Sequence, residues 1–215
     1  MAITFYAGSG SPYAWRVWLA LEHKQLPYDL KMLSFSNREH RAPEYLAINP
    51  RGKVPALVDG DLRLYESAAI VRYLEEAYPE RTLFPGTVRE RAKIHRLVAE
   101  SDYLERAQHD IFGSVFFTPQ DKWNLDLIET QRKALLTELA WLESALPEDG
   151  SAFLAGPLSM ADYAAYPVLA LSLRPERKKP DLAIAATLGP RTRAWKARIE
   201  ALPYFDKTYP PHWRS

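Results

Sequence analysis

Apolar and polar positions in the first part of the chain follow a pattern that predicts an α/β layer. Residues 3–6 form a short β-rich run, followed by a helix that begins at Ser11 and Pro12 and ends near Lys24. Serine is a favourable helix N-cap, and proline suits the first helical position. Residues 28–33 alternate with a period of two, which predicts a second strand.

A β-hairpin and one more helix complete the predicted layer. The dipeptide Asp59-Gly60 lies between two β-rich runs, at 54–58 and 62–65, and Asp-Gly is a strong signal for a hairpin turn. The following helix begins near Ser67 and stops before Pro79. Residues 43–46 predict a short helix before the hairpin, so the predicted order is strand, helix, strand, helix, hairpin and helix.

Beyond a linker around Pro85 the pattern becomes helical. Long amphipathic segments joined by short turns with Pro and Gly are typical of a helical bundle. The predicted helices span 88–117, 122–146, 159–171 and 188–202. The sequence thus predicts two domains of different class, an α/β domain at 1–80 and an all-helical domain at 89–215, joined by a linker at 81–88.

Composition narrows the environment in which we expect this protein. The 215 residues are 47% apolar and 26% charged, with a net charge of +1, so no general attraction to nucleic acid or to an anionic membrane is expected. No apolar run approaches the ~20 residues of a membrane-spanning helix. The first residues lack the basic start and apolar core of a signal segment. We expect a cytoplasmic protein.

The absence of cysteine excludes several kinds of chemistry. With no cysteine in the chain, no protein thiolate can act as a nucleophile, and neither disulfides nor cysteine–zinc sites can form. Five histidines are present, but none pairs with another at metal-ligand spacing. We therefore expect no metal site.

Four short motifs, in order along the chain, resemble those of the soluble glutathione transferases. They are Ser11-Pro12-Tyr13-Ala14-Trp15-Arg16-Val17, Asn49-Pro50-Arg51-Gly52-Lys53-Val54-Pro55-Ala56-Leu57, Leu64-Tyr65-Glu66-Ser67-Ala68-Ala69-Ile70, and Phe153-Leu154-Ala155-Gly156 with Ser159-Met160-Ala161-Asp162. Together they cover both domains. The chain resembles a serine-type, bacterial-like member of this family, which implies a thioredoxin-like first domain and glutathione as co-substrate.

The second and third motifs imply where glutathione lies. By this resemblance Val54 pairs its backbone with the cysteinyl residue, as an added strand would, and Pro55 follows a cis peptide bond. Ser67 holds the γ-glutamyl carboxylate at a helix N-terminus, where free N–H groups and the helix dipole favour an anion. Glu66 holds the adjacent ammonium. A purely structural interpretation of this pair is that Glu66 complements the dipole and Ser67 caps the helix.

Charged residues elsewhere are open to two interpretations. His40, Arg41 and Lys53 supply positive charge for the glycyl carboxylate, or are simply solvated side chains of a polar loop.

Asp162 lies three residues after Ser159, which is capping-box spacing, and we predict that it fixes the start of a buried helix rather than acting as a catalytic acid.

The implied chemistry is to supply the glutathione thiolate near neutral pH. Ser11, at the start of the first helix, is the natural hydroxyl donor to the sulfur. Ser9 and Tyr6 are the alternatives, because one lies in the same loop and the other lies at the end of the preceding strand. A fourth possibility is that Ser11 only caps its helix.

The predicted activity is conjugation of glutathione to small hydrophobic electrophiles. The electrophile pocket is expected at Tyr13, Phe35, Tyr103, Phe112 and Phe116, although aromatic residues at helical spacing also form cores. Two alternatives stay open: a glutathione-dependent isomerase and a non-catalytic glutathione-binding interaction protein. The resemblance also implies a homodimer, with no nucleic-acid or membrane partner.

Overall fold

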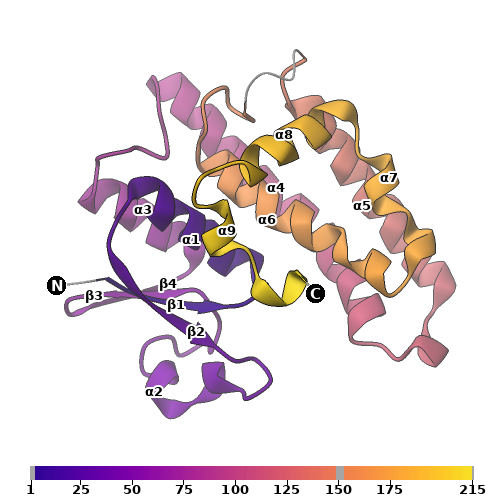
Figure 1. Cartoon of the computed structure of the whole chain (residues 1–215), viewed down its shortest axis with the longest axis horizontal. Coiled ribbons are helices and arrows are strands. Elements are labelled where there is room, and N and C mark those ends of the chain that lie inside the picture. Colours follow the sequence, from indigo (N-terminus) through magenta and orange to yellow (C-terminus); the bar gives the residue numbers. More distant parts are fainter. Residues whose placement is uncertain (1–2, 149–152, 215) are drawn as a thin grey trace. The chain divides into compact units, whose positions relative to one another are not determined.

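The computed structural model describes residues 3–148 and 153–214, and these form two compact units (Figure 1). The first unit contains residues 3–83 together with 202–214 from the other end of the chain. The described residues between 84 and 201 form the second. Within the described part, no helix is both long enough and apolar enough to cross a membrane.

A four-stranded mixed sheet is the centre of the first unit. Its strands are β1 (Ile3–Gly8), β2 (Tyr28–Leu33), β3 (Ala56–Asp59) and β4 (Leu62–Tyr65), in the order β2-β1-β3-β4. β1 and β2 are parallel, whereas β3 is antiparallel to both β1 and β4. The predicted hairpin is confirmed, with Gly60 at a φ of 62° in the turn. β3 begins at Ala56, two residues later than predicted, because Pro55 has no N–H for the ladder.

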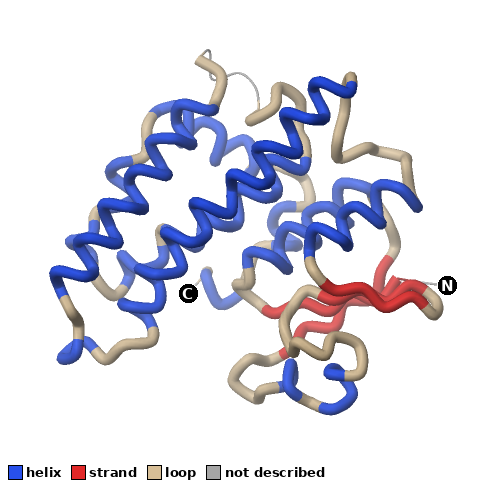
Figure 2. Tube along the Cα trace, turned by 180° about the vertical axis from the view of Figure 1, so that it is seen from behind, coloured by secondary structure: helices blue, strands red, loops and turns tan. Residues whose placement is uncertain are grey.

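Helices cover both faces of this sheet. Figures 1 and 2 show α1 (Pro12–Lys24) and α3 (Ser67–Ala77) on one face and the short helices η1 (Glu39–Arg41) and α2 (Pro43–Leu46) on the other. The core between the sheet and the first pair of helices is formed by fully buried apolar side chains: Phe5, Val17, Leu21, Leu57, Ile70 and Leu74. The α/β domain predicted from the sequence is therefore confirmed.

The last residues of the chain return to the first unit. They form α9 (Phe205–Thr208) and η5 (Pro211–Trp213), and α9 packs against α1. The prediction that these residues belong to the helical domain, which followed their position in the chain, is therefore wrong. Helices of three and four residues are too short to show a helical period, so the pattern gave no sign of this packing.

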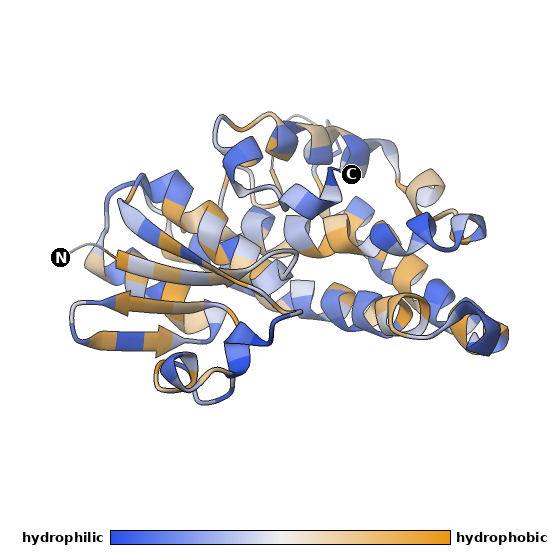
Figure 3. Ribbon diagram, turned by 60° about the horizontal axis from the view of Figure 1, so that its bottom comes forward, coloured by the Kyte–Doolittle hydropathy of each residue, from blue (hydrophilic) through white to orange (hydrophobic). Residues whose placement is uncertain are grey.

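The second unit is all-helical, as predicted. Its elements are α4 (Val88–Phe116), η2 (Gln120–Lys122), α5 (Leu125–Ala145), α6 (Met160–Ser172), η3 (Arg174–Arg177), η4 (Pro180–Leu182), α7 (Ile184–Thr187) and α8 (Pro190–Glu200). α6 is buried along nearly its whole length and packs on α4. Figure 3 shows hydrophobic and hydrophilic residues mixed along the helices, as expected for helices with one buried and one solvated side.

The boundaries of these helices follow their capping residues. α5 begins three residues later than predicted, because Asn124 is its N-cap and accepts a hydrogen bond from Leu127 N at 3.0 Å. α8 begins at Pro190 rather than at 188 because Gly189 occupies the N-cap position. α4 begins with a complete capping box between Thr87 and Glu90.

Candidate functional site

Three separate segments of the first unit meet at one end of the sheet. Tyr6 is paired with Ala56, and Ala56 is paired with Tyr65 on its other side. The loop after β1, the Val54-Pro55 segment before β3 and the Glu66-Ser67 segment after β4 therefore leave the sheet at the same end. This register brings together the motifs that the sequence analysis connected with the thiol, the cysteinyl backbone and the γ-glutamyl group.

Ser11 lies at the N-terminus of α1, as predicted. Its Oγ accepts a hydrogen bond from Ala14 N at 3.3 Å, and its own N–H donates to Gly8 O at 3.1 Å. The hydroxyl accepts in this bond, so its hydrogen remains available for a further partner. A capping role and a donor role for Ser11 are therefore compatible.

The two alternative donors have other neighbours. Ser9 Oγ lies 2.8 Å from His212 Nδ1, on the segment that returns from the C-terminal end of the chain. Tyr6 packs against Tyr45 of α2, with their ring centroids 5.6 Å apart. The Ser9–His212 contact joins residues 203 positions apart, and no local pattern in the sequence indicated it.

The Val54–Pro55 peptide bond is cis, which confirms the expectation from the sequence. Two side chains hold the residue before it: Tyr45 Oη and Asn49 Nδ2 both donate to Lys53 O, the amide at 2.6 Å. Burial raises the pKa of Tyr45 to about 12, so its hydroxyl stays neutral and remains a donor. In the described part of the sheet, Val54 lies outside the β3 ladder, which begins at Ala56.

The turn from β4 into α3 has an unusual backbone. Glu66 is the N-cap residue of α3 with φ 68° and ψ 113°, a region that residues other than glycine rarely adopt. Such conformations persist where the surrounding structure imposes them, and they cluster at ligand sites. Ser67 is buried, whereas the Glu66 side chain is exposed and lies 3.9 Å from Arg51. Arg51 is not among the site residues predicted from the sequence.

Basic groups surround the loop between α2 and β3. Arg41 Nη1 donates to Arg51 O at 3.3 Å, and Gly52 at φ 57° allows the close approach of Arg41, since a Cβ there would lie 2.8 Å from Nη1. Lys53 is exposed. Among the described residues, the buried His40 Nδ1 has no hydrogen-bond partner. Both cationic side chains and the imidazole are thus placed near one end of the cis-proline segment.

Two aromatic residues of the predicted electrophile pocket belong to the first unit. The Phe35 ring packs against Gly8, where an added Cβ would come within 2.3 Å of it, so a larger residue at position 8 would require the ring to move. Phe35 also contacts the His40 ring edge-on and is 45% exposed. Tyr13 lies in the first turn of α1 under the Arg16 guanidinium, 4.8 Å from the ring centroid.

The other three aromatic residues of that prediction lie on α4. Phe112 and Phe116 stack with centroids 4.3 Å apart, and Tyr103 is 56% exposed beside Arg106. None belongs to the buried stripe of α4, which is formed by Ile94, Leu97, Ser101, Leu104, Gln108, Ile111 and Val115. Tyr103 is therefore not a core residue, whereas Phe112 and Phe116 are half-buried, and the role of all three rings in a pocket stays a prediction.

Asp162 lies in the second unit, fully buried at the start of α6. Its carboxyl group accepts four hydrogen bonds: from Leu154 N and Trp195 Nε1 at 2.9 and 2.8 Å, and from the Ser159 N–H and hydroxyl at 2.9 and 3.2 Å. Burial raises its pKa to about 6, against the lowering effect of these donors. The capping box predicted from the sequence is present.

Comparison with known proteins matches both units to one family. The model of the glutathione S-transferase N-terminal domain matches residues 10–77, and that of the glutathione S-transferase C-terminal domain matches residues 124–198. Glutathione S-transferase 4 from Zea mays is 31% identical over 210 residues, 96% of this chain and 91% of the relative. Glutathione S-transferase A from Pleuronectes platessa is 29% identical over 215 residues, 98% and 92% of the two chains.

Solved structures agree with these sequence relatives. A glutathione S-transferase from the Antarctic clam Laternula elliptica superposes with a TM-score of 0.86 at 32% identity, covering 100% of this chain and 95% of its own. A match of this extent includes both domains. The chain belongs to the glutathione S-transferase family.

Proposed function

We propose that this protein is a serine-type glutathione transferase that ionises the thiol of glutathione and joins the sulfur to small hydrophobic electrophiles. The observation that carries the proposal is the convergence of three segments at one end of the sheet. They contribute a hydroxyl that accepts its capping bond and so can still donate, a cis-proline segment outside the β3 ladder, and a helix N-terminus. Relatives that share both domains bear the transferase name.

The proposed chemistry needs one strong hydrogen bond to sulfur. A cysteine thiol has a pKa near ~8.5, and a hydrogen bond to a charged group contributes about 1.5–3 kcal/mol, which lowers that pKa by one to two units. The N-terminus of α1 adds about 0.3–1 kcal/mol in the same direction. Ser11 supplies the hydroxyl because its capping bond leaves the hydrogen free. No protein base is required, since the thiol loses its proton to water.

The remainder of the tripeptide is held away from the sulfur. Val54 pairs with the cysteinyl backbone, and the first N–H groups of α3 with Ser67 take the γ-glutamyl carboxylate. Glu66 takes the ammonium. The strained backbone at Glu66 supports this assignment, because it fixes the side chain at the end of β4. His40, Arg41 and Lys53 form the positive side for the glycyl carboxylate.

The electrophile is a small apolar molecule, and glutathione is the only co-substrate in this proposal. Tyr13 and Phe35 offer apolar surface next to the thiol loop, and the exposed face of α4 offers Tyr103, Phe112 and Phe116. We further propose that the protein acts in the cytoplasm as a homodimer. Sedimentation of the purified chain tests the dimer.

Steady-state conjugation of glutathione to a chlorinated nitroaromatic tests the proposed function. We expect saturation in both substrates and elution of the protein from immobilised glutathione by free glutathione. Parallel assays of glutathione-dependent cis–trans isomerisation test the isomerase alternative. Binding of glutathione without turnover of either substrate would favour a non-catalytic interaction protein, and a folded protein that does not bind glutathione would contradict the proposal.

A further inference from the structure

The C-terminal segment, residues 202–214, is built into the same unit as the thiol loop. Trp15 Nε1, on α1, donates to Thr208 Oγ1 at 2.9 Å in a buried hydrogen bond. The Trp15 ring also contacts Phe205, Tyr209 and Trp213, with centroids 6.0, 5.7 and 5.6 Å apart. Trp15, four residues after Ser11, therefore contacts four residues of the C-terminal segment.

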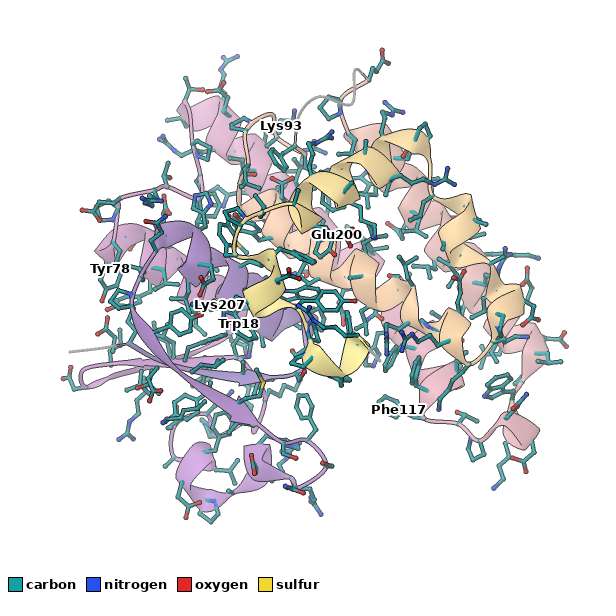
Figure 4. All side chains as sticks on the ribbon, viewed as in Figure 1. Trp18, Tyr78, Lys93, Phe117, Glu200 and Lys207 are labelled. Carbon is teal, nitrogen blue, oxygen red and sulfur yellow. The ribbon has the colours of Figure 1, made fainter. Side chains whose placement is uncertain are left out.

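An ion pair fixes the segment further along α1. Lys207 Nζ lies 2.6 Å from Glu22 Oε1, and Glu22 also accepts a hydrogen bond from Tyr28. Lys207 Nζ lies 5.1 Å from the centroid of the Tyr28 ring, and Trp18 of α1, labelled together with Lys207 in Figure 4, donates to Tyr28 Oη at 2.6 Å. These contacts hold the segment along the helix whose N-terminus carries Ser11.

The end of the segment lies directly against the thiol loop. His212 Nδ1 is 2.8 Å from Ser9 Oγ. Gly10 has a φ of 86°, which favours glycine, and a Cβ there would make tight contacts of 3.2 Å with His212 Cε1 and 3.3 Å with Trp213 Nε1. The space left between the loop, α1 and the segment is a cavity of only ≈ 10 Å³, lined in part by Ser9, Ser11 and Thr208. That volume is no more than one water requires.

We propose that His212 is a positioning residue for the thiol site. By holding the Ser9 hydroxyl it fixes the loop of residues 8–11 and hence the direction of the Ser11 hydroxyl. The bond has this effect with either atom as donor. If His212 Nδ1 accepts, the Ser9 hydrogen is engaged, and Ser11 is left as the hydroxyl that can donate to sulfur. This inference rests on the proposed function, and it gives the C-terminal segment a part in thiol activation.

The test compares His212 variants in the conjugation assay, together with the pKa of bound glutathione. His212→Ala should lower kcat near neutral pH about three- to tenfold, the rate equivalent of one ordinary hydrogen bond, and raise the pKa of the bound thiol. The KM for glutathione should stay within about twofold, because His212 acts through its hydrogen bond to Ser9 in the thiol loop, whereas other residues are assigned to the rest of the tripeptide.

Two substitutions at this position separate hydrogen bonding from packing. His212→Asn can place an amide atom near the position of Nδ1 and should recover most of the lost kcat. His212→Gln places its amide farther from the backbone and should not. Arg214→Ala is the matched control: it removes the contacts of Arg214 with the backbone and carboxylate of Asp206 and should leave the thiol pKa unchanged.

A double-mutant cycle then tests whether His212 acts through Ser9. His212→Ala should have no further effect on kcat in a Ser9→Ala background, because the shared hydrogen bond is already lost. Additive effects, or an unchanged thiol pKa in folded His212→Ala protein, would overturn the inference while leaving the wild-type activity as support for the proposed function. An inactive wild-type protein would instead overturn the proposed function.

Discussion

The N-termini of α1 and α6 both carry polar side chains, and these side chains have different surroundings. At α1 the Ser11 hydroxyl is partly exposed and accepts one bond of 3.3 Å, with its hydrogen free. At α6 the Asp162 carboxyl group is fully buried and accepts four bonds. At α1 the Ser11 hydroxyl can therefore still donate a hydrogen bond, whereas at α6 the oxygens of Asp162 already accept bonds from other groups of the protein.

We interpret the N-terminus of α1 as part of a binding site and that of α6 as a structural contact. Helix N-termini attract anions in both places, because their first N–H groups have no partner in the helix. At α6 the anion is part of the chain and links α6 to Trp195 of α8. At α1, and at α3 after the strained Glu66, our proposal is that the anion belongs to the bound glutathione. We therefore expect substitutions at α6 to affect stability and those at α1 and α3 to affect chemistry.

The largest effect is expected for Asp162→Ala. It leaves the N–H groups of Leu154, Ser159 and Trp195 buried without an acceptor, and each such group costs about 1–3 kcal/mol. The free energy of unfolding should fall by at least about 3 kcal/mol, measured by chemical denaturation. Turnover per folded molecule should stay near that of the wild type.

The matched control is Asp126→Ala, in the first turn of α5. Asp126 is exposed, so its loss should cost no more than about 1 kcal/mol, the usual contribution of a charge near a helix end. Normal stability combined with lost turnover in Asp162→Ala would show that Asp162, at the start of α6, belongs to the active site.

The burial of the Asp162 carboxyl group should make the stability of the protein depend on pH. Its native pKa of about 6 lies above the unfolded value near ~3.9, so the native state binds the proton more tightly. Its stabilising contribution is complete below about pH 4 and is lost as the pH rises through about 6, by roughly 2–3 kcal/mol.

Asp162→Asn cannot titrate at this position and provides the reference. The difference in unfolding free energy between wild type and Asp162→Asn should shrink from pH 4 to pH 7, measured by denaturation at several pH values. A difference that grows with pH would mean that the four donors outweigh burial and hold the carboxyl group ionised.

A smaller effect is expected at α3. Glu66→Ala keeps the Cβ and so the backbone constraint, but removes the partner of the ammonium, and Ser67→Ala removes the hydroxyl at the carboxylate. Each should raise the KM for glutathione about five- to twentyfold and lower kcat less, because these groups act far from sulfur. Glu76→Ala, an exposed residue of the same helix paired with Arg72, is the control and should change neither.

The smallest effects are expected for the basic groups near the cis-proline segment. Lys53→Ala and Arg41→Ala should each weaken glutathione binding by about threefold or less, since exposed ion pairs contribute little and are screened by salt. Calorimetric titration at low and high salt measures this. A loss larger than tenfold for one of them would identify the main partner of the glycyl carboxylate.

The sequence predicted the elements whose signals are local. The strand of alternating residues at Tyr28–Leu33, the Asp-Gly hairpin and the serine-proline start of α1 all appear as expected. The contact between Ser9 and His212 could not be predicted, because it depends on how the C-terminal segment packs on α1 through Trp15. Arg51 was missed for a similar reason: its approach to Glu66 depends on the pairing of β3 with β4.

The pKa of glutathione bound to Ser11→Ala tests the central claim most directly. Removal of the hydroxyl should return the thiol pKa toward ~8.5, read from thiolate absorbance. It should lower turnover near neutral pH about ten- to a hundredfold, and higher pH should recover part of the loss. Ser11→Thr, which keeps a hydroxyl, should retain much of the activity, and Tyr6→Phe should be mild. An unshifted thiol pKa in folded, glutathione-binding Ser11→Ala protein would contradict the account.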